Sequence, residues 1–259
     1  MTRAGKSTQK RYLVTGGAGF IGSHIVDALV ERGDEVVVID NLSTGKKQNL
    51  NPKAKFVKAD IRNLKKIGVY FKKIDGVFHA AALPRVQPSI ADPITTHDTN
   101  VNGTLNVLWA AKQANVKRVV YSASSSAYGN PETLPAKETL RPRPLSPYGL
   151  QKHIGEEYCR LFAELYGIET VALRYFNVYG PRMAEGGAYL TVIKTFLNQR
   201  ARKKPLTIVG DGSQTRDFTN VFDVVQANLL AMEKETVGCG EVMNIGPGQS
   251  YSVNQVAAM

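Results

Sequence analysis

Three glycines near the start of the chain constrain its fold more than any other feature. The segment YLVTGGAGFIG spans residues 12–22, and Gly16, Gly19 and Gly22 recur in it at every third position. An apolar run precedes them and a helical pattern of apolar residues follows, which predicts a strand, a tight turn and a helix. Glycines in such a turn let the backbone approach a pyrophosphate, and the N–H groups and dipole of the helix N-terminus stabilise its charge. We therefore expect a dinucleotide-binding site.

An acidic residue narrows the choice of dinucleotide. Asp40 follows a second apolar run, residues 35–39, and stands 18 positions after Gly22. A carboxylate at this place can accept hydrogen bonds from both hydroxyls of an adenosine ribose, and it repels a 2′-phosphate. NAD is therefore favoured over NADP as the cofactor. The alternative is an ordinary βαβ unit with a capping aspartate, but the coincidence of turn, helix and acid argues against it.

Length and composition exclude several classes of protein. The 259 residues are 43% hydrophobic and 21% charged, which is typical of a globular chain with a substantial core. No apolar run is long enough to cross a membrane, and the polar N-terminus lacks the apolar stretch of a signal peptide. The two cysteines, Cys159 and Cys239, have no metal-ligand spacing. We therefore expect no metal, no membrane partner and a cytoplasmic location.

The net charge of +11 makes nucleic acid a candidate partner. The lysines and arginines are scattered in short groups, such as residues 46–47, 65–66 and 72–73. No aromatic residues alternate with them as stacking platforms for bases. We prefer a solvated, lysine-rich surface as the explanation and expect no nucleic-acid partner.

Strands and helices alternate along the chain, which predicts an α/β fold with a doubly wound parallel sheet of the Rossmann type. Apolar runs end at Thr15, Asp40, Asp60, Ala82, Ser124 and Tyr175, and helical patterns start near residues 20, 100, 147 and 189. The carboxyl ends of such strands form the ligand crevice. We expect a mobile basic tail over residues 1–11, a NAD-binding domain over 12–175 and a smaller, mixed substrate lobe over 176–259. We expect part of that lobe to return to the sheet, and we interpret its last helical pattern as a sign of truncation at the C-terminus.

A possible proton-transfer set lies at the carboxyl end of the predicted sheet. Ser146 and Pro147 begin a helix that places Tyr148 and Lys152 one turn apart on one face. Ser124 ends a buried strand at the same edge as the glycine turn. A free phenol has a pKa of about 10, and a neighbouring lysine and a nicotinamide cation would both lower it. We expect Tyr148 to act as a general base, with Ser124 holding the oxygen of the substrate hydroxyl.

Further segments occur in a fixed order along the chain. They are Asp60-Ile61, HAAA at 79–82, NVNGT at 100–104, the strand ending at Ser124, the Tyr148/Lys152 pair, RYFNVYGPR at 174–182 and NIGPG at 244–248. Together with the glycine turn they resemble the extended short-chain dehydrogenase/reductase family over nearly the whole chain. Within it the sequence is most similar to nucleotide-sugar 4-epimerases of the UDP-glucose or UDP-N-acetylglucosamine type.

This resemblance implies roles for the matched positions. The cofactor-binding residues would be Gly16, Gly19, Phe20, Ile21, Gly22, Asp40, Asn41, Asp60, Ile61, Ala80, Ala81, Ala82, Asn100, Ser122, Tyr148, Lys152, Tyr175 and Val178. The substrate-binding residues would be Ser124, Ser125, Ser126, Tyr148, Asn177, Arg182, Leu190 and Arg216. Arg216 would bind a phosphate, which suits its forked guanidinium; the alternative is a structural pair with Asp211 or Asp217.

The family that this sequence resembles supports several reactions on one fold, so we use the residues beside Ser124 to distinguish among these reactions. Its dehydratases and decarboxylases carry Asp or Glu there, whereas this chain has Ser125, Ser126 and Ala127. An epimerase needs no such carboxylate, because it oxidises C4 of the sugar to a ketone and returns the hydride to the other face. We expect a NAD-dependent 4-epimerase of UDP-glucose/UDP-galactose or of their N-acetylated counterparts. A dehydratase or decarboxylase is the alternative, and a non-catalytic NAD-binding regulator is a more distant one.

Two predicted helices carry more apolar surface than a helix needs in order to cover one face of a sheet. Residues 101–114 are apolar around most of the helix circumference, and residues 148–166 carry a second apolar stripe beside the catalytic face. We expect a homodimer through these two helices, as is common in the family resembled. Burial under the second lobe is the alternative.

Overall fold

The computed structural model describes residues 9–183 and 192–259, and over these it is built on a seven-stranded parallel sheet. The strand order is β3-β2-β1-β4-β5-β6-β8, with the switch point between β1 and β4. The strands are β1 (Arg11–Thr15), β2 (Glu35–Asp40), β3 (Lys55–Lys58), β4 (Gly76–His79), β5 (Arg118–Ser124), β6 (Glu169–Tyr175) and β8 (Cys239–Ile245). This order confirms the predicted Rossmann fold, in which ligands bind outside the carboxyl ends of the strands at the switch point.

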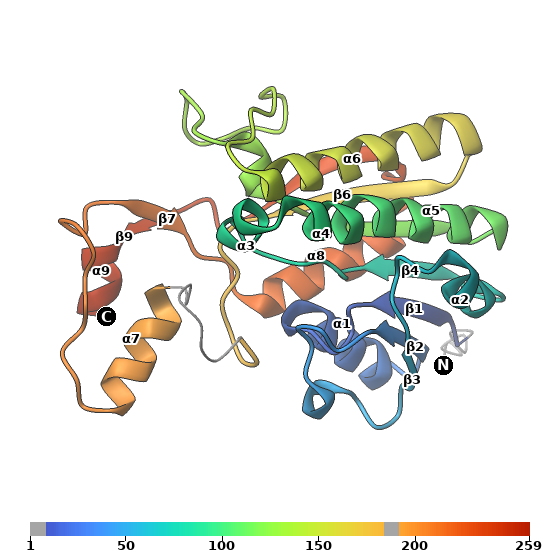
Figure 1. Cartoon of the computed structure of the whole chain (residues 1–259), viewed down its shortest axis with the longest axis horizontal. Helices are drawn as coiled ribbons and strands as arrows, with labels where there is room; N and C mark the ends of the chain where they lie inside the picture. The colour runs from blue at the N-terminus through green and yellow to red at the C-terminus, as the bar shows by residue number, and fades with distance from the viewer. Residues whose placement is uncertain (1–8, 184–191) are drawn as a thin grey trace, which may run out of the picture.

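Helices cover both faces of the sheet (Figure 1). On one face α1 (Phe20–Glu31) packs beside α8 (Val221–Glu233), and on the other α2 (Leu64–Gly68), α5 (Gly103–Gln113) and α6 (Pro147–Tyr166) lie together. Successive residues of a strand point to opposite faces, so Leu13 belongs to the core under α5 and α6, whereas Val14 belongs to the core under α1 and α8. The sheet is therefore packed between two buried cores. This packing holds its carboxyl edge, at which the predicted site lies, in place.

Three short helical segments connect β4 to α5. They are α3 (Val86–Ala91), α4 (Pro93–His97) and a π-helical stretch, Asp98–Asn102. Both α3 and α4 pack against α6. A π-helical turn inside a helix is rare and frequently marks a functional site.

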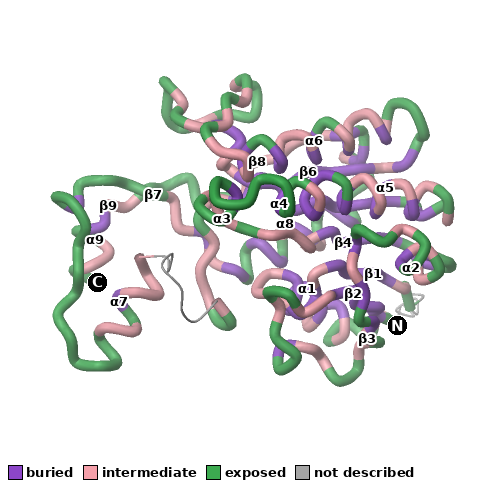
Figure 2. Tube along the Cα trace, in the orientation of Figure 1, coloured by how far each residue is buried: buried purple, intermediate pink, exposed green. Residues whose placement is uncertain are grey.

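The remaining elements form a smaller lobe at one end of the molecule (Figure 1). It contains α7 (Val192–Ala201), a two-stranded antiparallel sheet of β7 (Thr215–Asp217) and β9 (Ser250–Ser252), and α9 (Val253–Ala258). Figure 2 shows that most of this lobe is exposed, whereas the strands of the main sheet are buried. The segments α8 and β8 come from the same part of the chain but pack on the main sheet.

Several boundaries differ from those that the sequence predicts. The strands β3 and β4 end at Lys58 and His79, before the expected Asp60 and Ala82, and α5 begins at Gly103 after the π-helical stretch. The expected tail is too long, because Arg11 opens β1 and its N–H donates to the Asp75 carboxylate at 2.6 Å. The sequence pattern missed α8 altogether, and the helix start expected near residue 189 lies outside the described residues.

Among the described helices, none combines the length and apolar character that crossing a bilayer requires. The same residues hold no group of three or more His, Cys, Asp or Glu side chains placed to bind a metal ion.

Candidate active site

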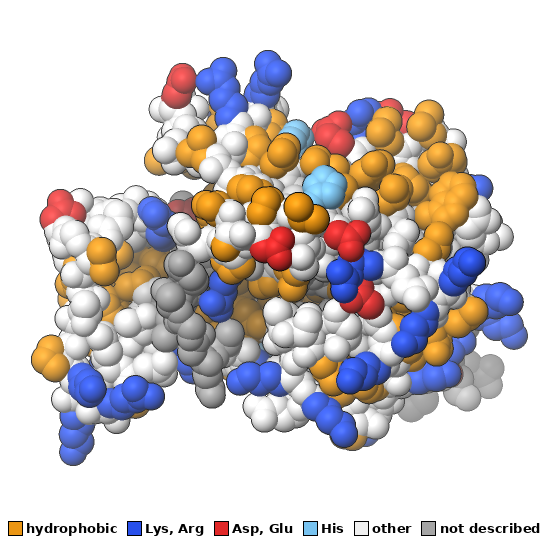
Figure 3. All heavy atoms as spheres, in the orientation of Figure 1, with side chains coloured by type: hydrophobic (Ala, Val, Ile, Leu, Met, Phe, Trp, Pro, Cys, Tyr) orange, Lys and Arg blue, Asp and Glu red, His pale blue; other side chains and the backbone are white. Residues whose placement is uncertain are grey.

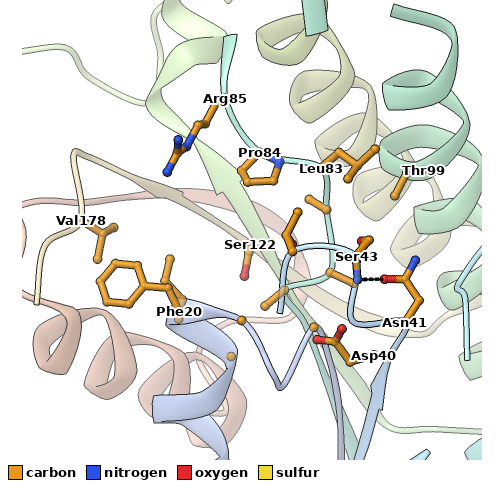
Figure 4. A pocket seen from close by; sticks show the side chains of 18 of the residues that line it. Phe20, Asp40, Asn41, Ser43, Leu83, Pro84, Arg85, Thr99, Ser122 and Val178 are labelled. Atoms are coloured by element: carbon orange, nitrogen blue, oxygen red, sulfur yellow. Dashed lines mark hydrogen bonds between the residues drawn. The ribbon is translucent and has the colours of Figure 1, made fainter. Parts of the chain in front are cut away.

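A cleft of about 340 Å³ opens at the carboxyl ends of the strands (Figure 4). It brings together nearly all of the predicted cofactor-binding residues. Those on its wall are Gly16, Gly19, Phe20, Ile21, Gly22, Asp40, Asn41, Ile61, Ala80, Ala81, Ala82, Ser122, Tyr148, Lys152, Tyr175 and Val178. Of that predicted set, Asp60 and Asn100 lie behind the wall rather than on it.

The glycine turn is shaped so that only glycine fits at its first and last positions. Gly16 has φ +72°, and a Cβ atom there would lie 2.7 Å from the Ala81 nitrogen. A Cβ at Gly22 would collide with the Gly16 carbonyl oxygen, so α1 starts directly against the turn. Gly19 caps α1 without a side-chain hydrogen bond, which leaves the first N–H groups of the helix to a ligand. The turn therefore has the form of a pyrophosphate cradle.

Asp40 ends β2 at the other end of the cleft, and its carboxylate is held by the backbone. Oδ2 accepts from the Ala18 N–H at 3.0 Å, and Oδ1 accepts from the Leu42 N–H at 2.7 Å. A carboxylate offers about four acceptor positions, so two remain for ribose hydroxyls. Asp40 thus links the glycine turn to the place where a ribose is expected.

Asp60 lies behind the cleft wall and supports the residues that form it. Its carboxylate pairs with Arg62 at 2.9 Å and accepts from Asn41 Nδ2 at 2.9 Å. Hydrogen bonds from Arg62 and Asn41 lower the pKa of Asp60 to about 2. Asn41 in turn accepts from the Ser43 N–H at 2.9 Å (Figure 4). Asp60 therefore orders the wall formed by Asn41, while Ala59 and Ile61 on either side of it line the cleft.

Tyr148 stands at the start of α6, where Ser146 caps the helix by accepting from the Gly149 N–H at 3.1 Å. The Tyr148 N–H donates to Ser89 Oγ at 3.0 Å, which ties the start of α6 to α3. Burial raises the pKa of Tyr148, and a hydrogen bond with the Ser124 side chain lowers it. The structure therefore places the Ser124 side chain near Tyr148, as a proton-transfer pair requires.

Lys152 lies one turn further along α6 and is 4% exposed. Its ammonium donates to the Ser122 carbonyl at 2.7 Å and lies 4.9 Å from the Tyr121 ring centroid. Burial lowers the pKa of Lys152 to about 8, and the nearby Glu156 carboxylate raises it. The sequence analysis expected Lys152 to lower the pKa of Tyr148, and that effect stays a prediction.

Asn100 and Tyr175 hold the cleft walls in place. Asn100 Oδ1 accepts from the Leu83 N–H at 2.8 Å, and its Nδ2 donates to Gln151 Oε1 at 2.8 Å. The π-helical stretch thereby connects the β4 loop to α6. The Tyr175 hydroxyl is hydrogen bonded to Ser122 Oγ at 3.1 Å, and burial raises the pKa of Tyr175 to about 12. Tyr175 is therefore a neutral wall residue.

The predicted substrate-binding residues are only partly brought together. Arg182 lines the cleft but pairs with Asp27 at 2.7 Å. Asn177 is exposed and donates to the Asp217 carbonyl at 3.0 Å, which joins the end of β6 to β7. Arg216 is exposed in the small lobe, and its Nη1 donates to the Thr215 carbonyl.

The other predicted substrate-binding residues lie near the cleft or outside the described residues. Ser124 ends β5 beside the cleft, Ser125 and Ser126 follow it, and Ser124 Oγ accepts from the Ser126 N–H at 3.2 Å. Leu190 lies outside the described residues. The binding roles of these residues stay predictions.

The sequence analysis missed part of the cleft wall. Leu83, Pro84, Arg85 and Thr99 line one side, and Ser43, Thr44 and Asn49 line the region near Asp40. Leu83 to Arg85 directly follow the HAAA segment, so their place after a strand end was a signal that could have found them. Asn49 lies far from any motif and donates to the Ala18 carbonyl at 3.1 Å, a contact that only the folded chain creates.

Comparison with known proteins agrees with this geometry. The family model described as "NAD dependent epimerase/dehydratase family" matches residues 12–246. A curated relative from Methanocaldococcus jannaschii, provisionally named a UDP-glucose 4-epimerase, is 47% identical over 248 residues, which cover 94% of this chain and 79% of the relative.

Two solved structures have closely similar folds. The UDP-glucose 4-epimerase of Thermotoga maritima with UDP-glucose is 43% identical, with a TM-score of 0.91 over 96% of this chain and 80% of that one. The UDP-N-acetylglucosamine 4-epimerase of Methanobrevibacter ruminantium, in complex with UDP-N-acetylmuramic acid, is 40% identical, with a TM-score of 0.92 over the same shares.

Proposed function

This chain belongs to the NAD dependent epimerase/dehydratase family, and from that premise we propose the reaction that it catalyses. The protein is a NAD-dependent nucleotide-sugar 4-epimerase. It inverts C4 of a UDP-hexose by transient oxidation to a 4-keto sugar and return of the hydride to the opposite face. The observation that carries this proposal is the place of Tyr148 and Lys152 on the cleft that holds the glycine turn, with the Ser124 side chain close enough to Tyr148 to lower its pKa.

The residues of the cleft fit NAD. The glycine turn and the N-terminus of α1 would hold the pyrophosphate, because the first turn of α1 has no side-chain cap and a Cβ at Gly16 or Gly22 would fill the cradle. Asp40 would hold the adenosine ribose, and Ser122, Tyr175 and Val178 would line the other end. When bound, NAD supplies the hydride acceptor and donor of the reaction.

The chain itself manages the proton. Tyr148 as a phenolate would accept the proton of the sugar O4 hydroxyl at its phenolic oxygen, and Ser124 would orient O4 by a hydrogen bond. The buried Lys152 ammonium, fixed on the Ser122 carbonyl, places a positive charge one turn from Tyr148. When the keto sugar is reduced again, Tyr148 returns the proton to O4. No net proton or hydride is consumed.

The alternative reactions of the family need a group that this site lacks. A dehydratase or decarboxylase is expected to use a carboxylate beside the catalytic serine, whereas Ser125, Ser126 and Ala127 follow Ser124 here. The intact Tyr148, Ser124 and Lys152 also argue against a regulator without turnover.

Replacement of the proton acceptor tests the mechanism. Tyr148→Phe is expected to lower kcat by about a hundred- to ten-thousand-fold, because general base catalysis is lost. NAD content and UDP binding should stay at wild-type levels, since the ring still fills its place on α6. Tyr158→Phe, on the same helix and outside the cleft lining, is the matched control and should keep full activity. Near-normal turnover by Tyr148→Phe would refute the assigned role.

We also propose that the enzyme is a homodimer through residues 101–114 and 148–166. Leu150 and Leu165 on α6 are 48% and 67% exposed, and hydrophobic side chains gather over α5 and α6 (Figure 3). The small lobe lies at the other end of the molecule, away from this face (Figure 1). Leu150→Glu combined with Leu165→Glu should give monomers by light scattering; a double variant that remains dimeric would contradict the interface.

The location and metabolic setting that we propose follow from the same function. Both cysteines are unpaired thiols, and Cys239 is exposed, which suits the reducing conditions of a cytoplasm. An epimerase of UDP-hexoses there would serve carbohydrate metabolism.

A further inference from the structure

Arg85 is a cation of the cleft wall to which the proposed mechanism gives no role. It lies in the loop between β4 and α3, lines the cleft and is only partly exposed. Within the part of the chain that the structure describes, its guanidinium has neither a hydrogen bond nor an ion pair. A guanidinium is a planar fork of N–H donors that matches the oxygens of a phosphate or a carboxylate. Its position on the wall therefore leaves five donors available to a ligand.

The other cations on the cleft wall already have protein partners. Arg182 is paired with Asp27 at 2.7 Å, and Lys152 donates to the Ser122 carbonyl at 2.7 Å. Lys46 and Lys194 also have interaction partners. Arg85 thus differs from each of them in having its whole hydrogen-bonding capacity unused.

The backbone at Arg85 is held in a conformation that favours glycine. Its φ is +86° with ψ 144°, a region that residues with a side chain rarely adopt. On one side, Leu83 is fixed through both its N–H and its carbonyl by Asn100, at 2.8 and 3.0 Å. On the other side, the Val86 carbonyl accepts from Ser89 Oγ at 2.6 Å, and Ser89 Oγ also accepts from the Tyr148 N–H. Strained residues held from both sides in this way cluster at ligand sites.

The position of Arg85 indicates which ligand it faces. Figure 4 shows it at the end of the cleft away from Asp40, with its guanidinium on the side where Phe20 and Val178 lie. Asp40 marks the adenosine end, so Arg85 lies toward the end where the nucleotide sugar is expected. We propose that Arg85 binds an anionic group of the nucleotide-sugar substrate, either its diphosphate or a carboxylate on its sugar. This inference rests on the proposed function only for the identity of the ligand.

Binding measurements on NAD-loaded protein test this proposal without relying on activity. UDP, UDP-glucose and UDP-glucuronate are titrated into the wild type, Arg85→Gln and Arg85→Gly by calorimetry, and NAD content and Tm are recorded for each. Arg143→Gln is the matched control, because Arg143 is an exposed arginine whose partner, Glu132, lies on the surface 3.7 Å away. Wild-type turnover of UDP-glucose is measured separately, so a failure of the proposed function is seen independently of ligand binding.

We expect Arg85→Gln to weaken substrate binding by about ten- to hundred-fold, the usual size of a lost charged hydrogen bond, with unchanged NAD content. Equal losses for all three ligands would assign Arg85 to the diphosphate. A loss confined to UDP-glucuronate would assign it to a sugar carboxylate. Arg85→Gly should lose the same affinity while its Tm stays equal or rises, because glycine adopts this backbone conformation without strain.

Three results would overturn the proposal. The first is wild-type affinity for all three ligands in Arg85→Gln, as expected for Arg143→Gln. The second is a loss of NAD in both Arg85 variants, which would place the guanidinium on the cofactor. The third is a wild type that binds none of the three ligands.

Discussion

The nucleotide-binding half of the molecule and the small lobe differ in how much side-chain surface they bury. Every residue of β5 is buried, and two continuous cores clamp the sheet. In the small lobe α7 buries only Phe196 and α9 only Val253 among their described residues, while Leu197 is 59% exposed and Val209 79%. The residues that we propose to handle the cofactor and the proton therefore stand on a scaffold fixed by packing. The small lobe gains little stability from packing of its own, so it can rearrange at low cost.

The nucleotide-binding half also buries a pair of charged side chains, so the loss of either charge is expected to destabilise it. Glu156 and Arg174 are 1% and 3% exposed, and their two hydrogen bonds measure 2.8 and 2.7 Å. Glu156 continues the face of α6 that carries Tyr148 and Lys152. The Arg174 guanidinium also lies 4.5 Å from the centroid of the Tyr128 ring. The face that carries the proposed catalytic residues is thus anchored by a buried charge pair.

The largest expected effect on stability comes from breaking this pair. Glu156→Gln should lower the free energy of unfolding by about 3–5 kcal/mol, because it leaves a buried guanidinium without its counter-charge. Urea denaturation measures the change. Glu164→Gln breaks a pair with Arg160 on the exposed side of the same helix, and we expect it to be indistinguishable from the wild type. Equal effects of the two variants would mean that burial does not distinguish the two pairs.

A pH dependence should follow from the buried His79. Its ring is hydrogen bonded to Thr15 Oγ1 at 2.7 Å and Thr104 Oγ1 at 2.9 Å, and burial together with the Lys152 charge lowers its pKa from 6.5 to about 3. Below pH 6.5 the unfolded chain therefore binds a proton that the folded chain rejects. Stability should fall as the pH drops from about 6.5 toward 3, by on the order of 5 kcal/mol in total.

Unfolding by urea at pH values of about 7, 6.5, 6 and 5.5 measures this slope above the range in which most carboxylates titrate. His79→Gln should have a shallower slope, whereas His97→Gln, at an exposed site on α4, should keep the wild-type slope. An unchanged slope in His79→Gln would show that other groups cause the acid sensitivity.

The smallest effect is expected in the small lobe. Leu197→Ala should change the free energy of unfolding by less than about 0.5 kcal/mol, because its side chain is already exposed. Leu108→Ala, the same substitution in the core of the nucleotide half, should cost about 2–5 kcal/mol. Thermal unfolding followed by circular dichroism compares the two. If Leu197→Ala were as damaging as Leu108→Ala, the contrast between the two regions would be wrong.

The sequence predicts the nucleotide half better than the small lobe, and the reason is physical. The glycine turn, Asp40 and the Tyr148/Lys152 pair depend on local spacing, and the structure places all of them on one cleft. Contacts between distant segments have no local pattern. The anchoring of Leu83 by Asn100 and the linkage of Asn177 to β7 are of this kind. Prediction also failed for α8, whose apolar face is apparent only once the sheet that it covers is known.

The most direct test of the central claim is the product formed from UDP-glucose by purified, NAD-containing enzyme. Nuclear magnetic resonance of the nucleotide sugars and absorbance at the NADH wavelength are followed together. We expect UDP-glucose and UDP-galactose to reach equilibrium from either side, with no added NAD consumed and no accumulation of NADH. A 4-keto-6-deoxy or decarboxylated product, or stoichiometric NADH without any C4 epimer, would contradict the assignment.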